Sequence, residues 1–193
     1  MPQNRRYPII INFDTKEEYL MITLNEQINI PVPFEKLCAW ADNFEEEFVK
    51  WSPYHLECEL LDGNLETGSR VRFYEIVMGK DYDVTGTIIE SYRDENRFKF
   101  VFQSDKKTAF ITFEGKKTEA GCHFSHTESF GMTTAIIGTI MNFLIFKILY
   151  RKKADWQLIR DDMILDNKYL YEILTENKYP ERITVEELKE NRK

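Results

Sequence analysis

The unequal distribution of strand and helix signals along the chain constrains the fold most. Between Tyr54 and Phe130, runs of alternating apolar and polar residues are separated by turn residues roughly every ten to fourteen positions. Such a succession predicts an antiparallel meander. From Thr133 to Asn177 proline is absent and apolar residues recur at helical spacing. The sequence therefore predicts one sheet followed by one long helix, which we expect to kink near 150–155.

Seven segments carry the strand pattern, and two short helices interrupt the series after the first. The strand segments are 19–30, 54–61, 68–78, 82–92, 98–102, 108–113 and 122–130. Pro31 and Pro33 open a short helix over 34–41, because proline is tolerated in a first helical turn. A second short helix is predicted over 43–50.

The inner face of a sheet must be buried, and the long helix is the only predicted element large enough to cover it. The predicted fold class is therefore α+β, with a curved antiparallel sheet of six or seven strands wrapped around the C-terminal helix. We expect an apolar cavity where the two faces do not meet. The expected organisation is an N-terminal arm (1–18), one ligand-binding domain (19–177) and a charged tail (178–193). In the tail, Thr184 and Glu187 have capping-box spacing for a short exposed helix.

Composition limits the partners and the compartment. The net charge is -7 and the basic residues are scattered, which argues against a nucleic-acid partner. The three cysteines are widely spaced and odd in number, so neither a disulfide framework nor a zinc knuckle is expected. The first residues are polar and lack the apolar core of a signal peptide. We therefore expect a cytoplasmic protein.

One apolar stretch, Ala135 to Tyr150, bears on membrane contact. Its 16 residues fall short of the roughly 20 that span a bilayer, and it contains Asn142 and Lys147. A buried helix is the preferred interpretation, and no transmembrane segment is expected. The alternative is interfacial contact, in which this stretch and the basic run 151–153 touch anionic lipid.

Strand parity identifies polar side chains that point inward. Glu75 shares its parity with Val71 and Phe73, whereas Arg70 and Arg72 lie on the opposite one. A buried carboxylate is costly unless it is paired, protonated or bound to a metal. A functional role and a simple internal partner such as an arginine are both open for Glu75.

The last strand and the long helix add further polar candidates. His126 and Glu128 share the inward parity of Phe124, so they can act as acid or base, bind a metal, or satisfy each other. Asp162 and Asp166 lie one helical turn apart on one face, where they form either a cation site or a solvated helix edge. No serine-centred nucleophile motif, phosphate loop or HExxH motif occurs in the sequence.

The order strand, two short helices, six strands and long helix resembles the START-like, or SRPBCC, superfamily, whose fold is called a helix-grip and whose members include polyketide cyclase-like proteins. The resemblance covers roughly residues 20–175. It is carried by the opening EQINIPVP at 26–33, by Trp51 after the short helices, by Gly68-Ser69 and by the terminal helix. It implies binding of lipids, polyketides, hormones or other apolar molecules in the cavity, and some members are cyclases or hydrolases.

A narrower resemblance is to the diacetylphloroglucinol hydrolase-like branch. Its marks here are the segments WSPYH at 51–55, FYEIVMG at 73–79 and GCHFSHTE at 121–128. Enzymes of that branch use zinc held by His and Glu to cleave a carbon–carbon bond. The positions that match their helical His and Glu are Asp162 and Asp166. The exchange of His for Asp replaces a soft nitrogen ligand by a hard oxygen, which favours an ion other than zinc, or none.

His55 enters only through that resemblance. Leu56, Cys58 and Leu60 form the inward parity of its strand, so parity predicts that His55 faces outward with Glu57 and Glu59. Its place at the start of the strand, after Pro53, leaves room for a departure from the pleat.

Two functions follow, and a third is the membrane-interface protein described above. The first is a binding module for a small apolar or aromatic molecule. Its expected ligand-binding residues are Phe73, Glu75, Tyr82, Phe98, Phe100, Phe102 and Phe124, beside His126 and Glu128. The second is a metal-dependent hydrolase acting on an acylated phenol or similar ketone. Its zinc or manganese ion would be held by His55, Glu75, Asp162 and Asp166, with His126 or Glu128 as acid or base.

Overall fold

The computed structural model describes residues 21–77, 79–132, 138, 141–142 and 153–190, with only the backbone at 153–155 and 189. Its strands are β1 Ile22–Ile30, β2 His55–Leu60, β3 Arg70–Val77, β4 Lys80–Arg93, β5 Arg97–Ser104, β6 Ala109–Thr118 and β7 Gly121–Phe130. Its helices are α1 Phe34–Asp42, α2 Phe44–Trp51, α4 Lys153–Glu176 and α5 Val185–Glu190. The predicted seven strands, two short helices and C-terminal helix are thus confirmed within these residues.

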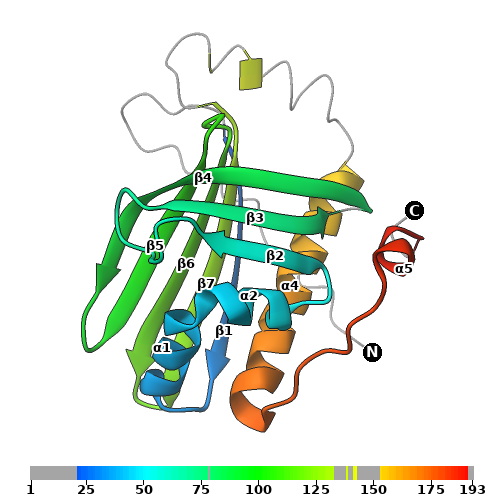
Figure 1. The fold of residues 1–193 in the computed structure, drawn as a ribbon. Coiled ribbons are helices and arrows are strands. Elements are labelled where there is room, and N and C mark those ends of the chain that lie inside the picture. Colours follow the sequence, from blue (N-terminus) through cyan, green and yellow to red (C-terminus); the bar gives the residue numbers. More distant parts are fainter. Residues whose placement is uncertain (1–20, 78, 133–137, 139–140, 143–152, 191–193) are drawn as a thin grey trace.

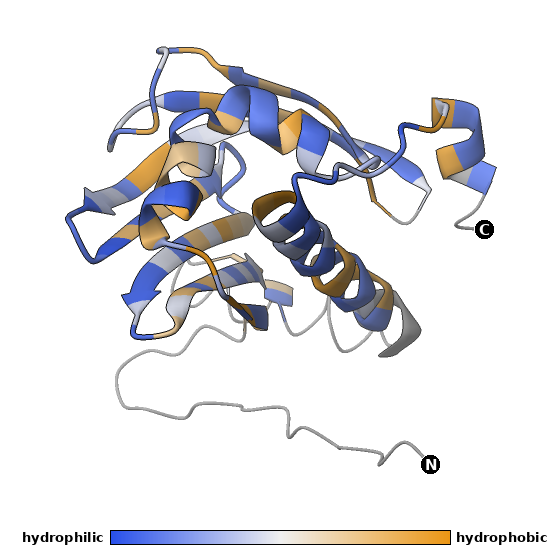
Figure 2. Cartoon of the chain, turned by 90° about the horizontal axis from the view of Figure 1, so that it is seen from below, coloured by the Kyte–Doolittle hydropathy of each residue, from blue (hydrophilic) through white to orange (hydrophobic). Residues whose placement is uncertain are grey.

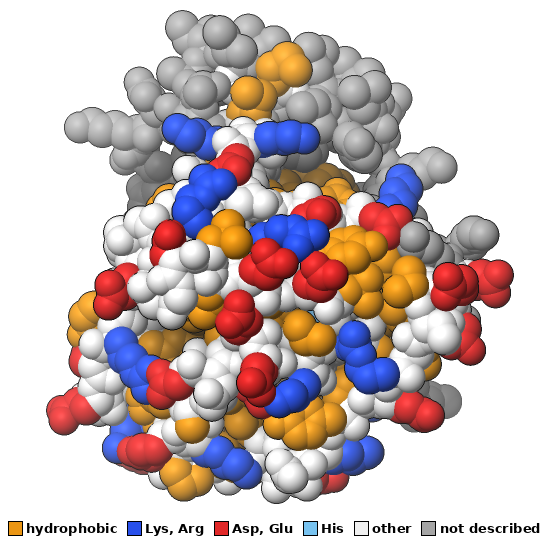
Figure 3. All heavy atoms as spheres, in the orientation of Figure 1, with side chains coloured by type: hydrophobic (Ala, Val, Ile, Leu, Met, Phe, Trp, Pro, Cys, Tyr) orange, Lys and Arg blue, Asp and Glu red, His pale blue; other side chains and the backbone are white. Residues whose placement is uncertain are grey.

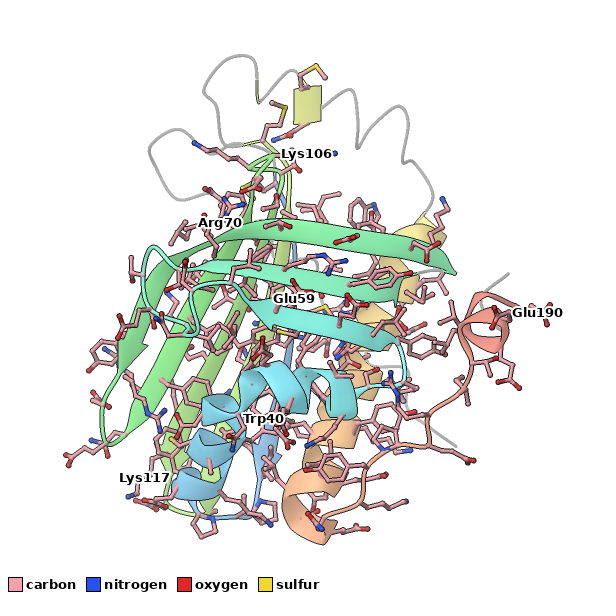
Figure 4. All side chains as sticks on the ribbon, in the orientation of Figure 1. Trp40, Glu59, Arg70, Lys106, Lys117 and Glu190 are labelled. Atoms are coloured by element: carbon pink, nitrogen blue, oxygen red, sulfur yellow. The ribbon has the colours of Figure 1, made fainter. Side chains whose placement is uncertain are left out.

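All seven strands form one antiparallel sheet in the order β1-β7-β6-β5-β4-β3-β2. The sheet is strongly curved. In Figure 1, β2, β3 and β4 run roughly horizontally, whereas β1, β5, β6 and β7 run roughly vertically. Lys106, in the β5–β6 turn, and Lys117, near the end of β6, mark opposite ends of the long strands (Figure 4). This curvature leaves an inner face that α1, α2 and α4 cover.

A largely aromatic cluster packs between the inner face of the sheet and the helices. Its rings pack at centroid separations such as 5.0 Å for Phe44 and Phe100 and 5.0 Å for Phe73 and Phe102. The phenylalanines predicted to line a cavity belong to this main cluster: Phe73, Phe98, Phe100, Phe102 and Phe124. The phenylalanines that alternate along the strands therefore form part of the hydrophobic core of the domain.

Helix α4 is held differently along its length. Its C-terminal half contributes Leu170, Ile173 and Leu174 to the main aromatic cluster. Its N-terminal half packs into a separate, smaller cluster through Ile159 and Met163, which contact Leu24 on β1. Hydrophobic and hydrophilic residues interleave along the helix (Figure 2), as expected for an element that touches both apolar clusters and a polar site.

The C-terminal segment is docked on the domain. Asn177, at φ 55°, ends α4, and the chain then turns back toward α2. The guanidinium of Arg182 donates to the carbonyls of Val49, Ser52 and His55 at 2.7, 2.9 and 3.0 Å. Thr184 and Glu187 form the predicted capping box at the start of α5. The predicted exposed helix is therefore present, but its Leu188 is fully buried.

The face shown in Figure 3 carries interspersed acidic and basic side chains. Several are paired, as where Arg72 contacts Glu57, Glu59 and Asp83. The three cysteines are free and buried. Among the described residues, none of the helices combines the length and apolarity that crossing a bilayer requires. The predicted buried helix over 135–150 and the predicted kink lie almost wholly outside the described residues.

Close packing of β4 on β5 makes Gly86 a sensitive position. A Cβ atom there would lie 2.1 Å from the carbonyl oxygen of Gln103 and 2.6 Å from the ring of Phe102. Because the nearest atom is backbone, a side chain can be admitted only by moving a strand. We expect Gly86→Ala to lower the free energy of unfolding by about 2–3 kcal/mol, measured by urea denaturation. A change below about 0.5 kcal/mol would contradict this packing.

Candidate functional site

A small pocket lies between the sheet and α4, beside the smaller apolar cluster. Its volume is about 40 Å³, enough for an ion or one or two water molecules. Its walls come from the turn before β2 and from β2, β3, β7 and α4. The lining residues are Tyr54, His55, Glu75, Ile76, Val77, Glu128, Ile159, Asp162 and Asp166. Figure 1 shows the start of β2 and the end of β3 beside α4 at this point.

His55 points into this pocket, so the outward orientation predicted from strand parity is wrong. The β2–β3 register shifts between His55 and Glu57, and this bulge turns the first residue of the strand inward. The imidazole is 5% exposed and stacks on Phe48 at a ring separation of 3.9 Å. Its Nδ1 lies 2.9 Å from the carbonyl oxygen of Phe48. A carbonyl only accepts, so Nδ1 is the donor.

That hydrogen bond sets the chemistry of the other ring nitrogen. In the neutral imidazole, Nε2 carries the lone pair and faces Asp166 Oδ2 at 3.6 Å and Glu75 Oε2 at 3.8 Å. A lone pair facing two carboxylates is unfavourable unless a proton or another cation lies between them. Burial lowers the pKa of His55, but Asp166 and Glu75 outweigh it and the pKa is raised overall.

Glu75 faces inward, as its parity predicts. It pairs across the sheet with His55 on β2 and with Tyr82 on β4. Burial raises the pKa of Glu75 to about 7, with Glu128 and Asp166 adding to the rise and His55 opposing it. A carboxyl group that titrates near neutrality can give or take a proton under ordinary conditions.

Helix α4 supplies the opposite wall. Asp162 and Asp166, one turn apart, both line the pocket, and Asp166 is 7% exposed. The backbone carbonyl of Asp166 accepts a hydrogen bond of 2.6 Å from Nε1 of the fully buried Trp51. This contact fixes the rotation and height of α4 relative to α2, and hence the position of both aspartates.

His126 and Glu128 complete the cluster from β7. His126 Nε2 lies 3.2 Å from Glu128 Oε1, and the imidazole is 4% exposed between the rings of Phe113 and Trp51. Neither ring nitrogen of His126 has a hydrogen-bond partner among the described residues. His126 therefore faces Glu128 through Nε2, and its other ring nitrogen, Nδ1, has no hydrogen-bond partner among the described residues.

The structure thus brings together the six polar candidates that the sequence singled out. They are His55, Glu75, His126, Glu128, Asp162 and Asp166. Tyr82 shares the face of Glu75 but is 42% exposed, and the five phenylalanines lie in the core. Their binding role stays a prediction.

No site role was predicted for the other residues here, although Trp51, Tyr54, Ile76 and Val77 lie in segments that carry the family resemblance. Tyr54, Ile76 and Val77 line the pocket, and Trp51 and Arg182 position its parts. Ile159 was recognisable only as an apolar residue of the helix.

The pocket is lined by residue types that bind metal ions, but these residues do not form a ready-made metal site. In the part of the chain that the structure describes, no three His, Cys, Asp or Glu side chains stand ready to hold a metal ion. The nearest approach is His55 Nε2 with its two facing carboxylates, since ligands bound to one ion at about 2.1 Å lie roughly 3.4 Å apart. The donation from His55 Nδ1 to a backbone carbonyl is the usual orientation of a metal-binding histidine. A metal ion held by these residues stays a prediction.

Comparison with known proteins identifies the fold. No family model matches the sequence, and no curated protein matches it significantly. Solved structures do match. Ara h 8.0201 aligns with a TM-score of 0.55 and 14% sequence identity, over 80% of this chain and 97% of its own. KanY protein aligns with a TM-score of 0.56 and 11% sequence identity, over 80% of this chain and 97% of its own. A START superfamily protein from Mycobacterium smegmatis aligns at 0.51 and 13% over 82% and 99%.

The chain therefore has the START-like, helix-grip fold that its element order predicted. Identities this low establish the fold alone. The narrower resemblance to the diacetylphloroglucinol hydrolase-like branch stays a prediction.

Stability should depend on pH through Glu75. Its folded pKa of about 7 lies above the ordinary 4.5, so folding favours the protonated form. That stabilisation is complete below pH 4.5 and is lost as the pH rises through 7. With a chelator present, we expect the free energy of unfolding to fall by about 2 kcal/mol more in the wild type than in Glu75→Gln between pH 5 and 8. Parallel pH profiles from urea denaturation would contradict the shift.

The two neighbouring tryptophans allow a matched test of the contact to α4. Trp40, labelled in Figure 4, is 4% exposed, and its Nε1 has no hydrogen-bond partner among the described residues. Trp51→Phe and Trp40→Phe remove similar volumes, but only the first removes a hydrogen bond. We expect Trp51→Phe to cost about 1–2 kcal/mol more in unfolding free energy. Equal costs would show that the contact with Asp166 does not stabilise α4.

Proposed function

We propose that the chain binds a small apolar or aromatic molecule between the sheet and the N-terminal half of α4, with the polar end of the molecule in the acidic pocket. The observation that carries the proposal is the position of this pocket: Val77 and Ile159 of its lining belong to the smaller cluster, and its His55 stacks on Phe48 of the main aromatic cluster. A ligand there would contact apolar walls and convergent polar groups, the combination typical of binding sites.

The walls of the pocket suit such a molecule. Ile76, Val77 and Ile159 supply aliphatic surface, and Tyr54 supplies an aromatic ring. Beyond Ile159, the smaller cluster continues with Leu24 and Met163. The polar end would meet carboxylates and the imidazole of His55, while the apolar body would extend along this surface.

Admission of a ligand larger than a few atoms requires α4 to move. Its N-terminal half is held by the smaller cluster and by a partly exposed ion pair between Arg160 and Glu26. Its C-terminal half is fixed by Leu170 and its neighbours in the aromatic core and by Trp51. Regions with few buried apolar contacts open at lower free energy. The N-terminal half would therefore separate from the sheet while the C-terminal half stays in place.

The test uses N-phenyl-1-naphthylamine, a fluorescent probe that is neutral at pH 7. We expect saturable binding to the wild type and a loss of affinity of about tenfold or more in Ile159→Trp, which fills the pocket. Ile164→Trp is the matched control, because Ile164 is 48% exposed on the same helix. Native mass spectrometry of the purified protein searches for a retained ligand. No binding, or equal loss in both variants, would refute the proposal.

A second candidate function, metal-dependent hydrolysis, is favoured by the orientation of His55. His55, Glu75, Asp162 and Asp166 would hold a divalent ion, and the bound ion would polarise a ketone or activate water. Phe48 fixes the tautomer that exposes the Nε2 lone pair. Glu128, with His126 behind it, would accept or return a proton on the opposite wall of the pocket.

Elemental analysis separates the two candidates. A hydrolase of this kind should retain about one equivalent of zinc or manganese after purification, and Glu75→Ala should lose it. Glu57→Ala is the control, since Glu57 lies on the exposed outer face of β2 and pairs with Arg72. Absence of metal, even after dialysis against both ions, would exclude the hydrolase and leave the binding function.

A further inference from the structure

The orientation of His55 depends on the end of α2 rather than on the pleat of the sheet. His55 is the first residue of the edge strand β2, and the β2–β3 register shifts directly after it. The imidazole stacks on Phe48 at 3.9 Å, and its Nδ1 donates to the carbonyl of the same residue. The backbone N–H of His55 donates to the carbonyl of Ser52 at 3.2 Å. His55 is therefore held only as firmly as the end of α2 itself.

The end of α2 needs hydrogen-bond donors from outside the helix. The last four carbonyl groups of a helix have no intrahelical partner, and in α2 these include the carbonyls of Phe48 and Val49. Many helices close with a residue in the left-handed conformation, whose following N–H groups satisfy these carbonyls. In α2 the C-cap residue, Ser52, is extended instead, at φ -134° and ψ 143°. The carbonyls at this end are thus open to other segments.

Arg182 supplies the donor from the C-terminal segment 178–190, which passes from the end of α4 to α5 (Figure 1). Its Nη1 donates to the carbonyls of Val49, Ser52 and His55 at 2.7, 2.9 and 3.0 Å. One cationic group therefore joins the last turn of α2, its C-cap and the first residue of β2. The helix dipole favours a positive charge at this end, and charged donors form the stronger hydrogen bonds.

The segment that carries Arg182 is anchored on both sides of it. On one side, the hydroxyl of Tyr179 donates to the carboxylate of Glu47 on α2 at 3.0 Å. On the other, Leu188 of α5 is fully buried, and α5 contacts β3. These contacts place the guanidinium at the end of α2 independently of its own hydrogen bonds.

We propose that Arg182 is a positioning residue of the candidate site, and that docking of the C-terminal segment regulates the site through it. Arg182 holds the end of α2, the end of α2 holds His55, and His55 then presents Nε2 to the pocket. Release of the segment would free three carbonyls at once and let the imidazole turn away from the pocket. The effect on ligand affinity rests on the proposed binding function, whereas the effect on His55 does not.

Arg182→Met tests the inference, because it keeps an apolar stem and removes the charged donor. The readout is the imidazole ¹H–¹⁵N resonance of His55 Nδ1, which carries its proton in both the neutral and the cationic ring. The chain has three histidines, so His123→Gln and His126→Gln assign it. We expect solvent exchange of this proton to accelerate about tenfold or more. The affinity for N-phenyl-1-naphthylamine should fall about threefold or more.

Matched variants separate positioning from stability. Arg182→Lys restores a charged donor and should recover most of both effects. Tyr179→Phe removes another hydrogen bond between the segment and α2 but leaves the three carbonyl contacts. Gly86→Ala destabilises the sheet through the contact of β4 with β5. We expect the last two variants to keep the exchange rate of the wild type and its affinity for the probe.

The outcomes distinguish this inference from the function on which it partly rests. Unchanged exchange in Arg182→Met, equal acceleration in Gly86→Ala, or faster exchange with unchanged probe affinity would overturn it. If the wild type does not bind the probe, the proposed binding function fails, and the exchange rates alone decide whether Arg182 positions His55. Thermal unfolding shows that each variant is folded, and Arg182→Gln replaces Arg182→Met if the latter is not.

Discussion

The indole of Trp51 holds the site together. It is fully buried at the end of α2, donates to the carbonyl of Asp166 at 2.6 Å, and contacts the rings of His55 and His126 at 5.3 and 6.0 Å. One side chain thus connects a short helix, the long helix and residues of both β2 and β7. A wide aromatic ring with one N–H donor is suited to this role. The ring packs on several neighbours, and its single hydrogen bond orients it toward one of them. Together with the apolar packing of Leu170 and its neighbours, that contact fixes the height of the α4 carboxylates above the sheet.

The position of Trp51 also explains why the two halves of α4 differ. C-terminal to Asp166, the helix faces the aromatic core through residues such as Leu170. N-terminal to it, the helix faces a polar pocket and then the small cluster that contains Ile159. The acidic residues lie at the boundary between a fixed and a less strongly held segment. Groups placed at such a boundary can be reached by a ligand while the fold stays intact.

Much of this architecture could be predicted from the sequence, because the strands obey the alternation that a sheet with one buried face requires. Parity placed Glu75, His126 and Glu128 inside, and helical spacing placed Asp162 and Asp166 on one face. Parity failed at His55, since a bulge shifts the register there and alternation holds only where the pleat is regular. The predicted aromatic lining could not be separated from core, because the same inward phenylalanines serve either role until the packing of the helices is known. The docking of Arg182 on three carbonyls likewise depends on backbone positions that no sequence pattern records.

Both candidate functions are shaped by one electrostatic feature: four carboxyl groups line a partly desolvated pocket. Protons relieve it in part, as the raised pKa of Glu75 shows. A metal ion would relieve it through the Nε2 lone pair of His55, but the carboxylates would have to rotate, because no three candidate ligands among the described residues stand in place. Within the described residues the charge is therefore relieved by protons, and the pKa values of both His55 and Glu75 rise.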